Sequence, residues 1–138
     1  MTFYMLDTNI ASAAMRGDAG IDQRLQELEP GTWCISAITR SELQYGVALK
    51  PGATRLARVV DAFLKVADVS PWSTAAADAH GQLRAELKLK GTSIGVFDEM
   101  IAAHALALGA IFVTDNMKHF SRVPGLTFEN WLRPTADR

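Results

Sequence analysis

Acidic side chains in separate parts of the chain have the types and neighbours expected of a metal-dependent hydrolytic site. Asp7 follows a short apolar run at residues 3–6, and Asp115 follows the clearest apolar run, at residues 110–114. Runs of this kind are typical of buried strands that end in a polar turn. Because open α/β sheets bind ligands at the carboxyl ends of their strands, we expect Asp7 and Asp115 to lie together at that edge.

Two further carboxylates fall on the inner faces of predicted helices. Asp98 begins an apolar stripe with helical spacing, and Glu42 shares a helical face with Ile38 and Tyr45. An unpaired carboxylate on an inner face costs several kcal/mol, so it needs cations, hydrogen-bond donors or a raised pKa. The Asp98 stripe contains no Lys or Arg, and its expected neighbours are more acids. Such converging charges favour a divalent ion, and oxygen ligands select Mg²⁺ or Mn²⁺ over Zn²⁺.

Each of these acids also has an ordinary structural explanation. Asp7 and Asp98 could be helix caps, Asp115 could belong to a turn, and Glu42 could form an ion pair with Arg40. The prediction of a metal site therefore depends on the convergence of the four side chains.

The elements that must position these acids alternate along the chain. Short apolar runs predict strands at residues 3–6, 33–36, 66–69, 110–114 and 126–131. Helical patterns between them cover residues 10–28 in two pieces, 36–50, 53–65, 73–90, 96–108 and 118–122. This alternation predicts an α/β fold, with a mainly parallel sheet covered by helices on both faces.

Composition narrows the class of protein further. The chain has 138 residues, 14 Lys and Arg against 15 Asp and Glu, and a formal net charge of −1. We expect one domain, residues 1–138, that does not coat nucleic acid or membranes through bulk positive charge. Cys34 is the sole cysteine, which excludes an internal disulfide and favours a core thiol in a reducing compartment. The start of the sequence lacks the features of a signal peptide, so we expect a cytoplasmic location and no membrane partner.

Basic side chains gather at two places near the expected acidic pocket. They are Arg84 and Lys88, before a glycine loop, and Lys118 and Arg122, after the Asp115 strand. A solvated helix face explains them; the functional alternative is a local rim that contacts RNA phosphates.

The order and spacing of several motifs resemble a known family. They are LDTN at 6–9, SEL at 41–43 with YG at 45–46, IGVFDEMIAAHA at 94–105, VTDN at 113–116, FSRVPGL at 120–126 and ENW at 129–131. Over essentially its whole length the chain resembles PIN-domain ribonucleases, specifically VapC-type toxins of bacterial toxin–antitoxin systems.

This resemblance implies a three-layer α/β/α sandwich and a Mg²⁺-dependent endoribonuclease with a pocket built from Asp7, Glu42 and Asp98. A fourth acidic or amide position is implied after Thr114, where this chain has Asp115 and Asn116. His119 departs from the pattern, because close relatives frequently carry an acid there. The resemblance further implies a homodimer, a VapB-type antitoxin whose tail enters the pocket, and cleavage of RNA, often tRNA.

On this hypothesis Asp7 and Asp98 hold the principal Mg²⁺, which Mn²⁺ could replace, and Glu42 ligates or orients the attacking water. Asp115 or Asn116 completes the site. Supporting positions are Thr8, Asn9 and Thr114, which would orient carboxylates and waters.

Two alternatives belong to other classes of protein. A PIN-like module could bind RNA or a protein without cutting, which the residues Asn116 and His119 favour. A phosphoacceptor receiver domain would need an acidic pair after the first strand and a Lys after the last, and the chain has neither.

Overall fold

The structure, a computed structural model, describes residues 2–133. Within them, five strands form one sheet in the order β3-β2-β1-β4-β5, and every neighbouring pair is parallel. The strands are β1 (Tyr4–Leu6), β2 (Trp33–Ser36), β3 (Val69–Ser70), β4 (Ile111–Val113) and β5 (Phe128–Glu129). The N-terminal strand β1 therefore lies in the middle of the sheet.

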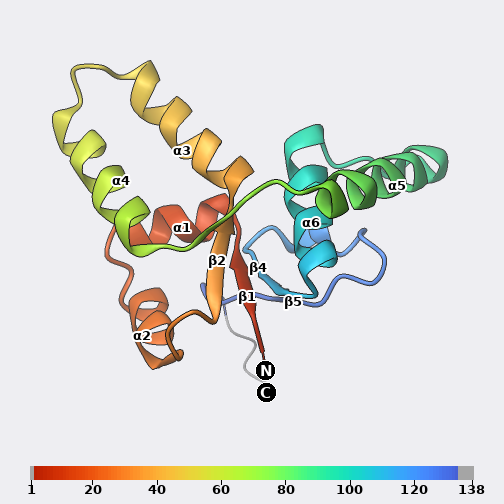
Figure 1. Cartoon of the computed structure of the whole chain (residues 1–138), viewed down its shortest axis with the longest axis horizontal. Helices are drawn as coiled ribbons and strands as arrows, with labels where there is room; N and C mark the ends of the chain where they lie inside the picture. The colour runs from red at the N-terminus through yellow and green to blue at the C-terminus, as the bar shows by residue number, and fades with distance from the viewer. Residues whose placement is uncertain (1, 134–138) are drawn as a thin grey trace.

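Helices cover both faces of this sheet. They are α1 (Thr8–Met15), α2 (Ala19–Glu27), α3 (Ala37–Leu49), α4 (Thr54–Val66), α5 (Thr74–Lys90), α6 (Val96–Leu108) and α7 (Met117–Phe120). Helices α1 to α4 lie on one side of the strands, and α5 and α6 lie on the other (Figure 1). The predicted α/β fold with three layers is confirmed.

Alternate residues of the central strands explain the two layers of core. Met5 of β1 and Phe112 of β4 are fully buried in the cluster that contains α5 and α6. Their neighbours Leu6 and Val113 are fully buried in the cluster that contains α1, α3 and α4. Successive side chains of a strand point to opposite faces, so strands buried on both faces must be apolar throughout.

Several predicted elements differ in their limits, and α1 is one of them, since it begins at Thr8 and not at Ile10. Val66 ends α4 and does not begin a strand, because the helix continues until Ala67 N bonds to Phe63 O. Helix α7 begins at Met117, since Asn116 caps it through a bond from His119 N. The run at 126–131 contributes only Phe128 and Glu129 to the sheet.

The carboxyl edge of the sheet is also where several helices begin. Asp7 caps α1 directly after β1, Ser36 caps α3 directly after β2, and Asn116 caps α7 just after β4. Helix N-termini carry exposed N–H groups and partial positive charge, which favours acidic side chains there. The fold thus gathers the acids where backbone dipoles stabilise them.

A buried histidine ties α6 to this edge. His104 is fully buried, its Nδ1 lies 2.8 Å from Ser36 Oγ, and its Nε2 lies 3.2 Å from Ser70 Oγ. Burial lowers the pKa of His104, which favours its neutral ring. The contact fixes α6, and with it Asp98, relative to the ends of β2 and β3.

No helix within residues 2–133 combines the length and the apolar character needed to cross a lipid bilayer.

Candidate metal centre

Asp7 is the most enclosed acid of the predicted pocket. It is 3% exposed, its Oδ1 accepts a bond from Thr8 N at 2.7 Å, and its Oδ2 accepts one from Thr114 Oγ1 at 2.8 Å. Asp7 is therefore both the cap of α1 and a member of the acidic cluster. The two explanations that the sequence offered for this residue are compatible.

The ionised form of Asp7 is disfavoured by its surroundings. Burial raises its pKa from the ordinary value of 3.8 to about 6, against the lowering effect of its bonds to Thr114 and Thr8. The negative charges of Asp98 and Glu42 make a smaller contribution to the same rise. The structure thus brings Asp7, Glu42 and Asp98 into one electrostatic cluster, as their positions in the sequence predicted.

Glu42 enters the cluster from α3 and is held by α1. Thr8 Oγ1 donates to Glu42 Oε1 at 2.6 Å and also contacts Thr39 Oγ1 at 3.2 Å. Within residues 2–133, no ion pair joins Glu42 to Arg40, which was the alternative explanation. The bond from Thr8 leaves Oε2 of Glu42 available to water.

Replacing Thr8 by valine tests this orientation. Valine keeps the shape of the side chain but removes the hydroxyl that fixes Glu42. We expect RNA cleavage to fall by about 10- to 100-fold, the range seen when a group that orients a metal ligand is removed. Steady-state cleavage assays would measure it, and Thr54→Val, at the exposed start of α4, is the matched control. Wild-type activity in Thr8→Val would contradict the role.

Asp98 lies in the first turn of α6 and is less enclosed than its stripe predicted. Its side chain is 33% exposed. The fully enclosed acid of this turn is its neighbour Glu99, which is 2% exposed and has Oε2 3.4 Å from Ile94 N. Asp98 falls at the end of the stripe, beyond the sheet edge, so it faces the pocket while the residues from Ile101 onward face the core. Burial of Glu99 was not predicted.

The two candidates for the fourth position point in different directions. Asp115 Oδ1 accepts a bond from Asn130 Nδ2 at 2.8 Å and pairs with Arg133 Nε at 3.2 Å. The backbone N of Asn116 instead donates to Thr114 Oγ1 at 3.0 Å, and the side chain of Asn116 contacts His119. Asn116, and not Asp115, is thus connected to the acidic cluster.

His119 completes a chain of contacts around Asp98. Its Nδ1 lies 3.3 Å from Asp98 Oδ2 and 3.0 Å from Asn116 Nδ2. The sequence marked His119 as a departure from the family pattern but gave no sign that its ring would meet Asp98. Both side chains are about one-third exposed, so solvent and a ligand have access to them.

The donor set fits a hard divalent ion. The carboxylates of Asp7, Glu42 and Asp98 repel one another, and Asp7 is deprived of water, so a cation in the pocket offsets a real energetic cost. Within residues 2–133, however, no three His, Cys, Asp or Glu side chains lie close enough together to enclose an ion. Carboxylate oxygens are the ligands that hard divalent ions prefer, and such ions can keep several of their waters where few protein ligands reach them.

The remaining predicted positions lie around the cluster. Thr114 is fully buried and links Asp7 to Asn116, whereas Asn9 is exposed and makes no side-chain bond within the described residues. Arg84 and Lys88 are exposed on α5 and line a hollow of about 260 Å³ beside the start of α6, together with Ser93, Gly95, Val96 and Glu99.

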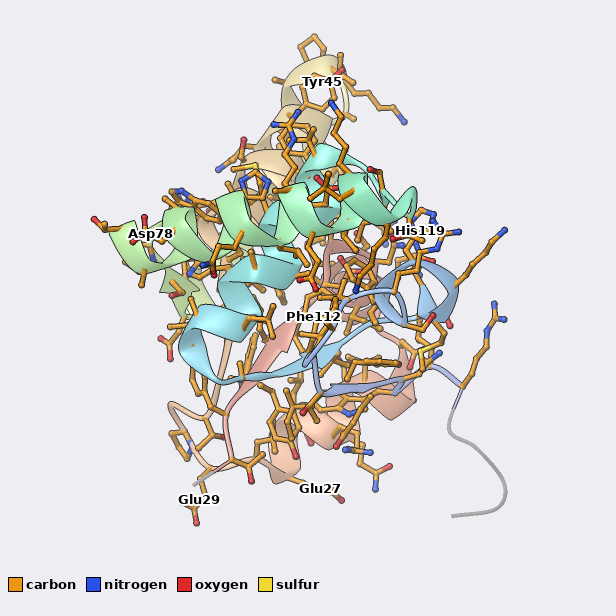
Figure 2. The ribbon with its side chains drawn as sticks, turned by 90° about the vertical axis from the view of Figure 1, so that its right-hand side faces the viewer. Glu27, Glu29, Tyr45, Asp78, Phe112 and His119 are labelled. Carbon is orange, nitrogen blue, oxygen red and sulfur yellow. The ribbon has the colours of Figure 1, made fainter. Side chains whose placement is uncertain are left out.

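The other two basic side chains flank this hollow and α7. Arg122 Nη1 donates to Ser93 O at 3.2 Å, and Lys118 is exposed on α7. Figure 2 shows His119 on the side of the molecule opposite to Asp78, which lies near the start of α5. Three of the four basic residues thus lie at or beside one hollow. The hollow is lined in part by Val96 and Glu99, which flank Asp98 in the chain.

Comparison with known proteins gives consistent matches. The family model described as PIN domain matches residues 4–126. The chain is 40% identical over 131 residues to the tRNA(fMet)-specific endonuclease VapC of Shigella flexneri, which covers 95% of this chain and 99% of the relative. It is 39% identical over 130 residues to Ribonuclease VapC2 of Rickettsia felis, covering 93% of this chain and 97% of the relative.

Solved structures match over the same extent. VapBC2 from Rickettsia felis, bound to a DNA fragment from its promoter, has a TM-score of 0.88 at 38% identity and covers 94% of this chain and 99% of the solved chain. DNA-bound VapBC from Salmonella typhimurium has a TM-score of 0.88 at 39% identity, with coverage of 95% and 99%.

Proposed function

The chain belongs to the PIN-domain family of VapC ribonucleases, and on that premise we propose that Asp7, Glu42 and Asp98 bind a divalent ion and cleave phosphodiester bonds of RNA. One observation carries the proposal. The carboxylate of Asp7 is buried at the sheet edge, with a pKa raised to about 6 by burial and by the charges of Asp98 and Glu42. Such an arrangement is unfavourable without a cation and is typical of a functional site.

Each side chain has a role that follows from its contacts. When bound, the ion would lower the pKa of a water molecule and offset the charge that develops on the phosphate. Asp7, fixed by Thr8 N and Thr114 Oγ1, and Asp98, at the pocket's open side, would hold the ion. Glu42, held at Oε1 by Thr8, would accept the proton of the attacking water at Oε2.

For the fourth position we assign Asn116 in preference to Asp115. The carboxylate of Asp115 is committed to Asn130 and Arg133, whereas the side chain of Asn116 lies against His119 beside Asp98. Asp115 then supports the end of the domain, and Asn116 shapes the pocket.

We propose tRNA as the substrate, because the relatives named above include the tRNA(fMet)-specific endonuclease VapC of Shigella flexneri. The basic side chains Arg84, Lys88, Lys118 and Arg122 would contact its phosphates. Contacts of this kind position a nucleic acid without reading its sequence. A net charge of −1 is compatible with this role, since the basic side chains are concentrated near the pocket.

For partners we propose a VapB-type antitoxin and a second copy of the chain. Related solved structures are VapBC complexes, which supports an antitoxin that restrains the nuclease. We further propose that residues 1–138 form a single PIN-like domain that contains the whole site. The protein would act in the cytoplasm, where its RNA substrate is found.

Removal of metal tests the proposal. Purified protein incubated with total tRNA and Mg²⁺ is expected to give discrete fragments on a denaturing gel, because one kind of bond is cut. Excess EDTA should abolish cleavage, and added Mg²⁺ or Mn²⁺ should restore it, since the carboxylates alone cannot activate water.

The ion alone should also stabilise the protein. Binding to the folded state raises its free energy of unfolding by mass action, so the melting temperature should rise with Mn²⁺ concentration. Cleavage that persists in EDTA would refute the metal-dependent mechanism. RNA binding without cleavage in any metal would favour the alternative of a non-cutting PIN-like module.

A further inference from the structure

One nitrogen of the His119 imidazole lies close to both a hydrogen-bond donor and a hydrogen-bond acceptor. The donor requires a lone pair on that nitrogen, and the acceptor requires a proton. Its Nδ1 is 3.0 Å from Asn116 Nδ2 and 3.3 Å from Asp98 Oδ2. The orientation of the Asn116 amide is fixed, because its Oδ1 accepts the bond from His119 N at 3.2 Å. The group that Asn116 presents to the ring is therefore its NH₂, a donor.

Each imidazole nitrogen carries either one proton or one lone pair in the ring plane, so it either donates or accepts a hydrogen bond. Since Asn116 donates to it, Nδ1 bears a lone pair and no proton. That lone pair then stands beside a carboxylate oxygen of Asp98, and two electron-rich atoms face each other with no hydrogen between them. A proton on Nδ1 would satisfy Asp98 but would oppose the amide of Asn116. A cation is the partner that both Nδ1 and Oδ2 accept.

The separation of the two atoms suits such a cation. Adjacent ligands of an octahedral ion at about 2.1 Å are about 3 Å apart. Asp98 Oδ2 and His119 Nδ1 are 3.3 Å apart, on side chains that are 33% and 37% exposed. The pair is open to an ion from solvent and needs only a small adjustment to share one.

We propose that His119 Nδ1 is a metal ligand together with Asp98, which gives the pocket a mixed nitrogen and oxygen donor set and a preference for Mn²⁺ over Mg²⁺. This inference rests on the proposed function and adds the identity of a ligand and of the preferred ion. Imidazole nitrogen binds first-row transition ions more readily than it binds Mg²⁺, whereas the remaining ligands, carboxylate and water, accept either ion. With an ion bound at Nδ1, the NH₂ of Asn116 would donate to water, while its Oδ1 would keep the bond from His119 N.

Spectroscopy of bound Mn²⁺ tests the inference directly. The full chain, freed of metal and loaded with Mn²⁺ alone, should show coupling of the electron spin to an imidazole nitrogen. The chain has three histidines, His80, His104 and His119, and His104 is fully buried between two serines. We expect the coupling to persist in His80→Gln, the matched control on α5, and to disappear in His119→Gln and His119→Glu.

Binding affinities give a second readout. Calorimetric titration should show Mn²⁺ binding at least about tenfold more tightly than Mg²⁺ in the wild type. In His119→Glu, which supplies oxygen in place of nitrogen, this ratio should fall to a few-fold while both ions still bind. Circular dichroism would verify that each variant folds.

The outcomes separate this inference from the proposed function. Nitrogen coupling that survives in His119→Gln, or an unchanged ratio of affinities in His119→Glu, overturns the role of His119. Mn²⁺ binding and RNA cleavage without any nitrogen coupling overturn it too, and leave the proposed function intact. A wild-type chain that binds neither ion overturns both.

Discussion

Replacing Asp98 by asparagine is expected to lower the rate of RNA cleavage by at least about a thousandfold and to leave the fold intact. Loss of an anionic ligand removes several kcal/mol of the electrostatic stabilisation that a metal gives the transition state. The fold depends little on this carboxylate, because its side chain is 33% exposed and, within residues 2–133, its hydrogen bond is the one to His119. Cleavage rates on tRNA at saturating metal would measure the effect.

The matched control for this change is Asp78→Asn. Asp78 is an exposed carboxylate on α5, on the side of the molecule opposite to His119 (Figure 2). The control should cleave at the wild-type rate and melt at the wild-type temperature. A comparable rate in Asp98→Asn and in the control would remove Asp98 from the proposed site.

Replacing Asp7 by asparagine is expected to abolish cleavage but to stabilise the metal-free protein. The folded state holds this carboxylate in a buried position, beside Asp98 and Glu42, which raises its pKa from 3.8 to about 6. A shift of this size corresponds to about 3 kcal/mol of stability lost at neutral pH. Asparagine keeps an oxygen for the bond from Thr8 N and carries no charge, so the variant recovers part of that loss.

The pH dependence has a definite sign. Because the pKa of Asp7 is higher in the folded than in the unfolded chain, the folded state binds the proton more tightly. The contribution of Asp7 to stability is therefore fully present below about pH 4, decreases as the pH rises to about 6, and is constant above that. This decrease should be absent in Asp7→Asn.

Urea unfolding of the metal-free protein at pH 4 to 8 would measure both effects. Saturating Mn²⁺ should stabilise the wild type and have little effect on Asp7→Asn, because binding acts through the same carboxylate. A variant that is less stable than the wild type at pH 7, or that keeps the wild-type slope between pH 4 and 6, would contradict the electrostatic account of Asp7.

The positions of strands and helices could be predicted closely because local patterns determine them. The run at 33–36 is apolar and bounded by Gly31 and a cap residue, and it forms β2 with those limits. The weak strand at 66–69 was misplaced, because Val66 fits the sequence pattern of two elements. It can end an amphipathic helix, as it does in α4, or begin a strand. Pairing across the sheet decided between them, and that pairing is not encoded locally.

The acidic cluster could be predicted because burial of charge is visible in a sequence as an acid on an apolar face. Glu42 and Asp98 were identified in this way, and Asp7 was identified by its position at the end of a predicted strand. The directions of the Asp115 and Asn116 side chains could not be predicted, because adjacent residues after a strand point in different directions. Which of them faces the pocket depends on the bond from Asn130 to Asp115 and on the cap that Asn116 forms for α7. The contact of His119 with Asp98 spans 21 positions and has no local signal.

The central place of β1 in the sheet has a consequence for synthesis of the protein. Leu6 pairs with Ile35 on one side, and with Val113, much later in the chain, on the other. The bond from Thr114 to Asp7 likewise joins residues 107 positions apart. On a translating ribosome, one edge of β1 stays unpaired and the acidic cluster stays incomplete until the last strands emerge. The nascent chain therefore lacks the complete acidic cluster until β4 and Thr114 have been made, which leaves time for a restraining partner to be present first.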